Sequence, residues 1–275
     1  MRSSPSLTAL VAAITVTAAP AMVSTTRVET PAAFDHGYRT YHEVLTRVVK
    51  GARVDYRALI ADRAALDRTV DQIALVSESD EARWTREQRL AFWINAYNVV
   101  TLRSIVDHYP IRGSLFTLYP RNSIRQIAGV WSDQRWHVAG RSLTLDQIEH
   151  EVLRPVFKDP RVHLAINCAS KSCPPLRFEP YLGAAIDQQL DDAARRFLGS
   201  AQGATLTGGR LAVSSIFKWY GDDFIASYAG GAGAEAAIRA FVIRYGSGAT
   251  ASAAKTATPL RFLPYDWSLN YSDQP

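Results

Sequence analysis

Both cysteines of this chain, Cys168 and Cys173, stand five positions apart in the stretch "RVHLAINCASKSCPPL". A cysteine attacks as a thiolate, which a nearby histidine commonly stabilises while a third group orients the imidazole. His163 lies five positions before Cys168 and supplies a histidine for such a set. The residue types therefore point to thiol chemistry, a disulfide or a metal site, and all three stay open at this point.

The thiol hypothesis assigns a role to each polar residue near these cysteines. The nucleophile is Cys168 or, as second choice, Cys173, and His163 is the base. Asp266 or Asn95 orients the imidazole, in an inventory similar to that of papain-like and transglutaminase-like enzymes. N–H donors of the turn at 167–172 would hold the oxyanion of a peptide or amide carbonyl. The residues expected to bind substrate are Asn98, Asn167, Ser170, Ser172, Trp93 and Trp267.

The pairing of His163 with Cys168 meets a geometric obstacle. We expect residues 162–166 to form a strand, and successive side chains of a strand point to opposite faces. If the strand continued to Cys168, the imidazole and the thiol would face opposite sides. Cys173 lies beyond the following turn and could fold back more easily. The alternative bases are His137 and His150.

A disulfide between Cys168 and Cys173 is the second hypothesis, because an exported protein meets an oxidising compartment. So short a loop gains roughly 2 kcal/mol on closure, and the main effect would be on loop shape. The protein would then be a non-catalytic module that binds a peptide or glycan of the cell envelope. The aromatic residues expected to line its groove are Trp93, Tyr97, Trp219 and Trp267.

A metal site is the third hypothesis. The His-x4-Cys-x4-Cys spacing offers three ligands, enough for a catalytic zinc that also binds water. The usual Cys-x2-Cys and His-Glu-x-x-His spacings are absent from the sequence, so we predict no metal and no other cofactor. The Gly-x-Ser-x-Gly, Walker and dinucleotide-binding glycine motifs are absent too, which argues against serine hydrolases and nucleotide enzymes.

The N-terminus predicts export. An apolar run from Leu7 to about Ala19 follows one cation, and Ala19-Pro20-Ala21 fits the small-x-small pattern of signal peptidase sites. The run is shorter than the roughly 20 residues that span a bilayer, so we expect no stable membrane anchor. The expected location is the periplasm or the extracellular space. The expected division is a signal peptide at 1–21, a flexible leader at 22–34 and a globular domain at 35–275.

The composition is that of an ordinary globular protein, with 47% hydrophobic and 21% charged residues. The formal net charge of +5 is spread along the chain, without a run of basic residues and interleaved aromatics. We therefore expect no nucleic acid partner. We expect the protein to act as a monomer.

A long helix is the clearest of the elements that must position these side chains. Thr85 and Gln88 form a capping box at its start, and Pro110 marks its end. Apolar residues occupy most of its circumference, so we expect it to be central and buried. Asn95 and Asn98 share one face, and a buried amide must find hydrogen-bond partners. They are expected either to brace loop backbone or to orient a catalytic group.

Shorter helices and hairpins complete the expected fold. Helical spacing marks residues 38–49, 57–75, 144–155, 186–198 and 234–245, whereas 246–258 is expected to be a loop and 260–270 strand-like. Hairpins are expected to turn at Ala139-Gly140 and at Gly208-Gly209. Helices and hairpins mix without strict alternation. This indicates an α+β fold, a single globular domain of mixed helices and short antiparallel hairpins around a central buried helix.

Several separated motifs give the chain a family resemblance. They are "VDY" (54–56), "FWINAYN" (92–98), "SLTLDQIEHEVLR" (142–154), "DPRVHLAINCASKSCPPL" (159–176), "FKWYGDDF" (217–224) and "YDWSLN" (265–270). Their order resembles the family named domain of unknown function 547. One departure is Lys171, where a small residue is expected. The resemblance implies a single domain, often in exported bacterial proteins, and it assigns no activity.

Overall fold

The computed structural model describes residues 33–229, 232–256 and 258–272. The expected signal peptide, and the leader up to residue 32, lie outside the described residues. The packed unit begins at Phe34. The ring centroid of Phe34 lies 5.2 Å from that of Trp84 and 5.4 Å from that of Phe92.

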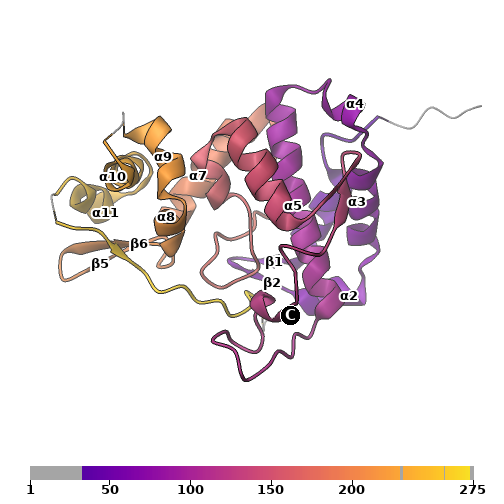
Figure 1. Ribbon diagram of the computed structural model, residues 1–275, viewed down its shortest axis with the longest axis horizontal. Coiled ribbons are helices and arrows are strands. Elements are labelled where there is room, and N and C mark those ends of the chain that lie inside the picture. The colour runs from indigo at the N-terminus through magenta and orange to yellow at the C-terminus, as the bar shows by residue number, and fades with distance from the viewer. Residues whose placement is uncertain (1–32, 230–231, 257, 273–275) are drawn as a thin grey trace, which may run out of the picture. The chain divides into compact units, whose positions relative to one another are not determined.

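The expected helices are present in order along the chain, except that the stretch at 57–75 forms two helices (Figure 1). The α-helices are α1 (Arg39–Val48), α2 (Tyr56–Ala61), α3 (Ala64–Leu75), α4 (Glu78–Glu81), α5 (Arg86–His108), α6 (Leu145–Gln147), α7 (Ile186–Leu198), α8 (Ser215–Trp219), α9 (Gly221–Tyr228), α10 (Ala234–Tyr245) and α11 (Gly248–Ala254). Of these, α4, α8, α9 and α11 are additional to the expected helices. The 3-10 helices are η1 (Ile124–Gln126), η3 (Pro160–Leu164) and η4 (Gly183–Ala185), and η2 (Ile148–Phe157) is a π-helix.

The strands are short and mostly antiparallel, which confirms the predicted α+β class. Ala139 and Gly140 both have positive φ, 48° and 72°, as a two-residue primed turn requires. The predicted hairpins are confirmed. The pairs are β1 (Val49–Lys50) with β2 (Arg53–Val54), β3 (Trp136–Val138) with β4 (Arg141–Leu143), and β5 (Ala204–Thr207) with β6 (Arg210–Val213), and β7 (Arg261–Phe262) adds parallel to β6.

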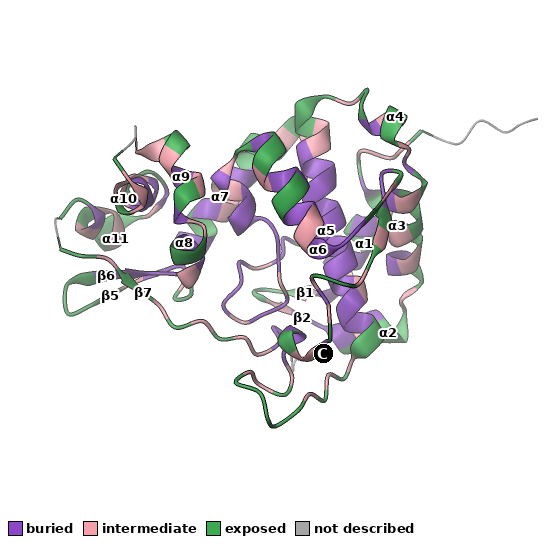
Figure 2. Ribbon diagram, viewed as in Figure 1, coloured by how far each residue is buried: buried purple, intermediate pink, exposed green. Residues whose placement is uncertain are grey.

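Helix α5 is the buried centre of the first of two hydrophobic clusters, as predicted (Figure 2). Both hydrogen bonds of the capping box between Thr85 and Gln88 are present. The helix packs against α2, α3, α6 and α7. The second cluster lies among α7, β6 and α8 to α10, around Phe217, Phe224 and Phe241. Among the described residues, no helix combines the length and apolar character needed to cross a membrane.

The expected strand at residues 162–166 is wrong. The segment forms the 3-10 helix η3, which begins with Pro160. The Asp159 side chain accepts from the Arg161 N–H at 3.0 Å, and a proline at the first position is favourable because it has no N–H to leave unpaired. These starting signals outweigh the β-branched and apolar residues that suggested a strand.

Two further expectations near the C-terminus are corrected. The segment 246–258 contains the helix α11, which its alanine-rich sequence favours. Ala254 of this helix is buried in the second cluster. The strand-like run at 260–270 keeps only the two residues of β7 as a strand. The remainder is extended chain that passes beside the cysteine loop.

The two asparagines of α5 brace backbone, which was one of the two expectations. Asn95 binds both backbone groups of Tyr181, donating to the carbonyl at 2.7 Å and accepting from the N–H at 2.9 Å. Asn98 donates to the Ala165 carbonyl at 3.1 Å and accepts from the Asn167 N–H at 2.8 Å. Each amide thus satisfies two buried backbone groups, and Asn98 positions the segment that leads into the cysteines.

We predict that Asn98→Ala lowers the free energy of unfolding by about 3 kcal/mol, because a buried donor and a buried acceptor lose their partners. Urea denaturation measures this loss. Asn122→Ala is the matched control, since the described residues give the Asn122 side chain no hydrogen bond. It should stay within roughly 0.5 kcal/mol of the parent protein. Equal losses in both variants would contradict the bracing role of Asn98.

Candidate functional site

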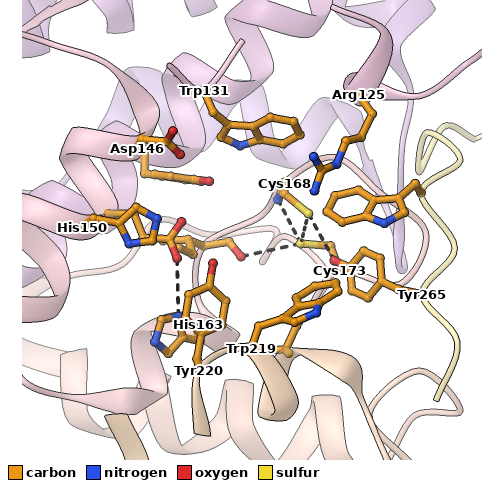
Figure 3. A pocket seen from close by; sticks show the side chains of 15 residues that line it. Arg125, Trp131, Asp146, His150, His163, Cys168, Cys173, Trp219, Tyr220 and Tyr265 are labelled. Atoms are coloured by element: carbon orange, nitrogen blue, oxygen red, sulfur yellow. Dashed lines mark hydrogen bonds and ion pairs between the residues drawn. The ribbon is translucent and has the colours of Figure 1, made fainter. Parts of the chain in front are cut away.

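A cavity of about 440 Å³ opens where the site loop, residues 167–173, meets η2, α8 and the run after β7. Figure 3 shows Cys168 and Cys173 at its centre, with Arg125 and Trp131 on one side and His163 and Tyr220 on the other. The lining residues are Tyr97, Arg125, Trp131, Asp146, Glu149, His150, His163, Ile166, Cys168, Cys173, Ile216, Trp219, Tyr220, Tyr265 and Trp267.

Both cysteines are free thiols, Cys168 partly exposed and Cys173 buried. Their sulfur atoms lie 2.9 Å apart, and the Cys168 N–H donates to Cys173 Sγ at 2.9 Å. The Tyr265 hydroxyl accepts from Ser170 Oγ at 3.0 Å and lies 3.2 Å from Cys168 Sγ. Ser170 Oγ also lies 3.2 Å from this sulfur. Cys168 is therefore the thiol that a molecule in the pocket can reach.

The two thiols differ in acidity. Hydrogen bonding by the Cys173 thiol, opposed by burial and assisted by Ser170 and Tyr265, lowers the pKa of Cys168 from 9.0 to about 7. Burial, followed by the adjacent Cys168 sulfur, raises the pKa of Cys173. Burial and the two sulfurs also raise the pKa of Tyr265. Near neutral pH, a Cys168 thiolate thus lies beside two groups that keep their protons.

Asn167 shapes the site loop through its side chain. Its Oδ1 accepts from the Ala169 N–H at 2.8 Å, and its Nδ2 donates to the Pro174 carbonyl at 2.6 Å. Ala169 has a φ of 57°, in the left-handed region that non-glycine residues rarely adopt. The buried amide of Asn167 therefore holds a strained turn between the two cysteines, and it faces backbone on both sides.

Ser172 and Asp266 join the site loop to the run after β7. Ser172 Oγ donates to Gln202 Oε1 at 2.8 Å and accepts from the Asp266 N–H at 2.9 Å. The Asp266 carboxylate accepts from the Ser268 N–H at 2.8 Å. Asp266 thus caps its own segment, and the structure does not bring it to His163.

Most backbone N–H groups of the site loop are already hydrogen-bonded within the fold, so the expected oxyanion site at this turn is wrong for them. Their acceptors lie in α5, in the loop itself and in the run after β7. The bonded donors are the N–H groups of Asn167, Cys168, Ala169, Lys171, Ser172 and Cys173.

His163 is buried between two carboxylates. Its Nε2 lies 2.8 Å from Asp223 Oδ2, and its Nδ1 lies 3.6 Å from Glu149 Oε1, an ion-pair distance too long for a hydrogen bond. Its ring stacks on Tyr220 with centroids 3.9 Å apart. Neither nitrogen contacts a thiol. The structure thus places His163 and Cys168 on the same pocket without the direct pairing expected for a base.

The charges around His163 favour the imidazolium. Burial lowers the pKa of His163, but Asp223 and Glu149 outweigh it and raise the pKa above 6.5. Burial raises the pKa of both carboxyls, but His163 brings the pKa of Glu149 below its ordinary value. His163 and Arg154 do the same for Asp223. The two carboxylates and the His163 imidazole therefore stabilise each other's charged forms.

The π-helix η2 brings Glu149 and Arg154 to this cluster. A π-helix repeats its hydrogen bonds from residue i to i+5, so residues five apart lie on one side. In an α-helix the same pair would diverge by roughly 140°. Arg154 donates to both Asp223 oxygens, at 2.7 and 2.9 Å. The change of helical period is what places both side chains beside Asp223 and His163.

The expected aromatic groove is partly present. Tyr97, Trp219 and Trp267 line the pocket. Trp93 does not, because it is fully buried in α5 and donates its indole N–H to Glu81 Oε1 at 3.0 Å. Among the described residues, no group of three or more His, Cys, Asp and Glu side chains is arranged to hold a metal ion.

Three residues that line the pocket, Arg125, Tyr220 and Tyr265, and Asp223 next to His163 were not among the candidates expected from the sequence. Tyr220 and Asp223 stand in the motif "FKWYGDDF", and Tyr265 stands in "YDWSLN". Their presence in those motifs was the available signal. Arg125 carries no such signal, because its place depends on three aromatic rings, of which Trp267 is distant in sequence and the other two lie in irregular chain on either side of it.

We predict that His163→Gln costs about 3 kcal/mol of unfolding free energy near pH 5.5, since it leaves the buried Glu149 carboxylate without its cation, whereas Asp223 keeps Arg154. The folded-state pKa of His163 is raised, so its stabilisation is complete below the unfolded value of about 6.5 and is lost as pH rises through the folded value. The difference between variant and parent should therefore shrink above pH 6.5. Urea denaturation from pH 5.5 to 9 measures it, with exposed His137→Gln as the control. A difference that grows with pH would overturn this assignment.

Comparisons with known proteins give one match. Residues 82–198 match the family described as protein of unknown function, DUF547. No curated protein and no solved structure matches the chain. The matched segment holds α5, η2, His163 and both cysteines, and it ends before Tyr220 and Tyr265. The resemblance seen in the sequence is thereby confirmed over residues 82–198, which match the DUF547 family model.

Proposed function

We propose that the pocket is the active site of a thiol-dependent acyl-transfer enzyme, a hydrolase or an acyl transferase, with Cys168 as its nucleophile. One observation carries the proposal: Cys168 Sγ reaches the pocket with the hydroxyls of Ser170 and Tyr265 each within 3.2 Å. A thiolate is the attacking form of cysteine. These neighbours stabilise it without an imidazole at hydrogen-bond distance.

In the first step, the Cys168 thiolate attacks the acyl carbonyl carbon of an amide or ester. A carbon–sulfur bond forms, and the bond from the carbonyl carbon to the leaving nitrogen or oxygen breaks. The leaving group takes a proton from the Tyr265 hydroxyl, whose raised pKa keeps it protonated until then. The products are a thioester on Cys168 and the free amine or alcohol.

In the second step, water or an acceptor amine attacks the thioester carbon. The carbon–sulfur bond breaks, Cys168 leaves as a thiolate, and the proton of the attacking group returns to Tyr265. With water the net reaction is hydrolysis, and with an amine it is acyl transfer. His163 takes no proton in either step, because both its nitrogens face carboxylates.

The oxyanion of the tetrahedral intermediate needs donors from the pocket walls. Trp131, Trp219 and Trp267 line the pocket, and the described residues give their indole N–H groups no acceptor. Preorganised donors of this kind stabilise developing charge strongly when water is excluded. These three tryptophans would thus stabilise the oxyanion, a role first expected of the N–H groups at 167–172.

The sequence supplies the setting of the proposal. We propose that residues 1–21 direct export and that the protein acts, as a monomer, on peptide or amide bonds of the cell envelope. The support is the apolar run that ends in Ala19-Pro20-Ala21.

The 2.9 Å distance between the sulfur atoms favours a second candidate, thiol–disulfide exchange. The Cys168 thiolate would attack a substrate disulfide, forming a mixed disulfide and releasing one thiolate. Cys173 would then lose its proton to solvent and attack Cys168 Sγ, which forms the internal disulfide and releases the second thiolate. An accessible acidic thiol beside a buried, less acidic one suits this sequence of events. The oxidised product is also the disulfide that a purely binding module would require.

We predict that p-nitrophenyl acetate acetylates Cys168, with a burst of p-nitrophenolate of about one equivalent per chain. Cys168→Ala should lower the rate by about 100-fold, and peptide mapping should place the acetyl group on Cys168. Cys173→Ser is the control and should retain the burst, since acyl transfer needs one thiol. An unchanged burst in Cys168→Ala would rule out the proposed nucleophile. A burst lost with Cys173→Ser as well would contradict acyl transfer by one thiol and show that Cys168 needs the Cys173 thiol to react.

We predict that iodoacetamide labels Cys168 with a pH midpoint of about 7. Cys173→Ala should raise the midpoint by about one unit, because the hydrogen bond between the two thiols is the largest cause of the lowered pKa of Cys168. Cys173→Ser keeps a hydroxyl donor and should shift the midpoint less. Stopped-flow labelling with mass analysis gives the midpoints. Identical midpoints in the parent protein and Cys173→Ala would contradict the account of the acidity.

A further inference from the structure

Arg125 is held at the pocket by aromatic rings. It lies in η1, which the Ser123 hydroxyl caps by accepting from the Arg125 N–H at 3.1 Å. Its guanidinium carbon lies 4.3 Å from the ring centroid of Trp267, 4.9 Å from that of Tyr119 and 5.2 Å from that of Trp131. Three such contacts attract the cation and limit its rotamers. Arg125 is therefore a positioned charge.

No described carboxylate forms an ion pair with this guanidinium, and its side-chain N–H groups have no acceptor among the described residues. Asp146, which lines the same pocket, attracts it only through a longer-range Coulombic interaction. Arg154, the other arginine near this pocket, forms an ion pair with Asp223. A guanidinium presents its donors in a planar fork that fits a carboxylate. Figure 3 shows the Arg125 head group directed toward the interior of the pocket on the side of Cys168.

The aromatic rings also connect Arg125 to the thiol. Trp267 packs on Tyr265 with ring centroids 4.6 Å apart, and the Tyr265 hydroxyl lies 3.2 Å from Cys168 Sγ. Trp219 packs on both rings, 5.8 Å from Trp267 and 4.8 Å from Tyr265. One continuous wall therefore carries the cation at one end and the nucleophile at the other. A molecule lying along this wall would meet both.

We propose that Arg125 is a carboxylate-binding subsite, so that the acyl substrate attacked by Cys168 carries a carboxylate group. This rests on the proposed function and names its substrate class. A monoanion fits better than a phosphate, because Asp146 and Glu149 line the same pocket and repel a second negative charge. Asp146 makes no ion pair with a described residue.

Iodoacetate and iodoacetamide test the subsite directly. The two reagents alkylate a thiol by the same displacement: a carbon–sulfur bond forms and iodide leaves. Iodoacetate carries a carboxylate and iodoacetamide a neutral amide, and neither reaction creates an oxyanion that Arg125 could stabilise instead. The quantity measured is the ratio of their rate constants at Cys168, at pH 8, in the parent protein, Arg125→Gln, Arg125→Lys and Arg112→Gln. Arg112→Gln is the matched control, because this exposed residue loses the same charge away from the pocket.

We expect Arg125→Gln to lower the iodoacetate-to-iodoacetamide ratio about tenfold, Arg125→Lys to lower it less, and Arg112→Gln to leave it unchanged. An equal ratio in the parent protein and Arg125→Gln, or an equal loss in Arg112→Gln, overturns the subsite. If neither reagent labels Cys168, the proposed nucleophile fails. Titration with butyrate, a monocarboxylate, then decides the subsite by tryptophan fluorescence, because Trp131 and Trp267 contact Arg125. Saturable quenching in the parent protein that Arg125→Gln abolishes supports the subsite, and its absence from the parent overturns it.

Discussion

The ion pairs of His163 join the two hydrophobic clusters at the point where the chain passes from one to the other. Val162 belongs to the first cluster and Leu164 to the second. Glu149 approaches from η2, which packs with the first cluster, and Asp223 from α9, whose neighbour Phe224 lies in the second. A buried charge is tolerated only when it is paired. The imidazolium therefore fixes how η2, η3 and α9 meet, and the pocket lies over that junction.

The acidity of the thiol has a separate origin. Cys168 depends on short contacts with Cys173, Ser170 and Tyr265, whereas His163 depends on two carboxylates. This separation distinguishes the pocket from a thiol–imidazole pair, in which one proton position serves both groups. It also explains why the thiolate needs a rigid loop. Small shifts of the Asn167 turn would lengthen every contact that stabilises the negative sulfur.

The local elements of this fold could be predicted from the sequence, because each depends on neighbours in the chain. The capping box at Thr85, the turn at Ala139-Gly140 and the shared face of Asn95 and Asn98 are of this kind. The π-helix could not be predicted, since a periodicity of 3.6 assumes the α-helical hydrogen-bond pattern.

The charged parts of the site depend on pairs distant in sequence. Asp223 meets a histidine that lies 60 residues earlier. Tyr265 meets a thiol 97 residues earlier. No spacing rule encodes such pairs, and burial decides them. The cysteines were identified as candidates from their type and neighbourhood, but their acidity and their partners needed the folded chain.

The extended run after β7 connects the second hydrophobic cluster to the first. It leaves β6 through the bond from the Leu263 N–H to the Val213 carbonyl, and it ends against β2, where the Ser272 N–H donates to the Val54 carbonyl (Figure 1). Tyr265 lies near the start of this run, two residues after Leu263. A displacement of one cluster relative to the other would move this run and so change the distance from the Tyr265 hydroxyl to Cys168 Sγ. The rate at which Cys168 reacts would therefore change with any displacement of one hydrophobic cluster relative to the other.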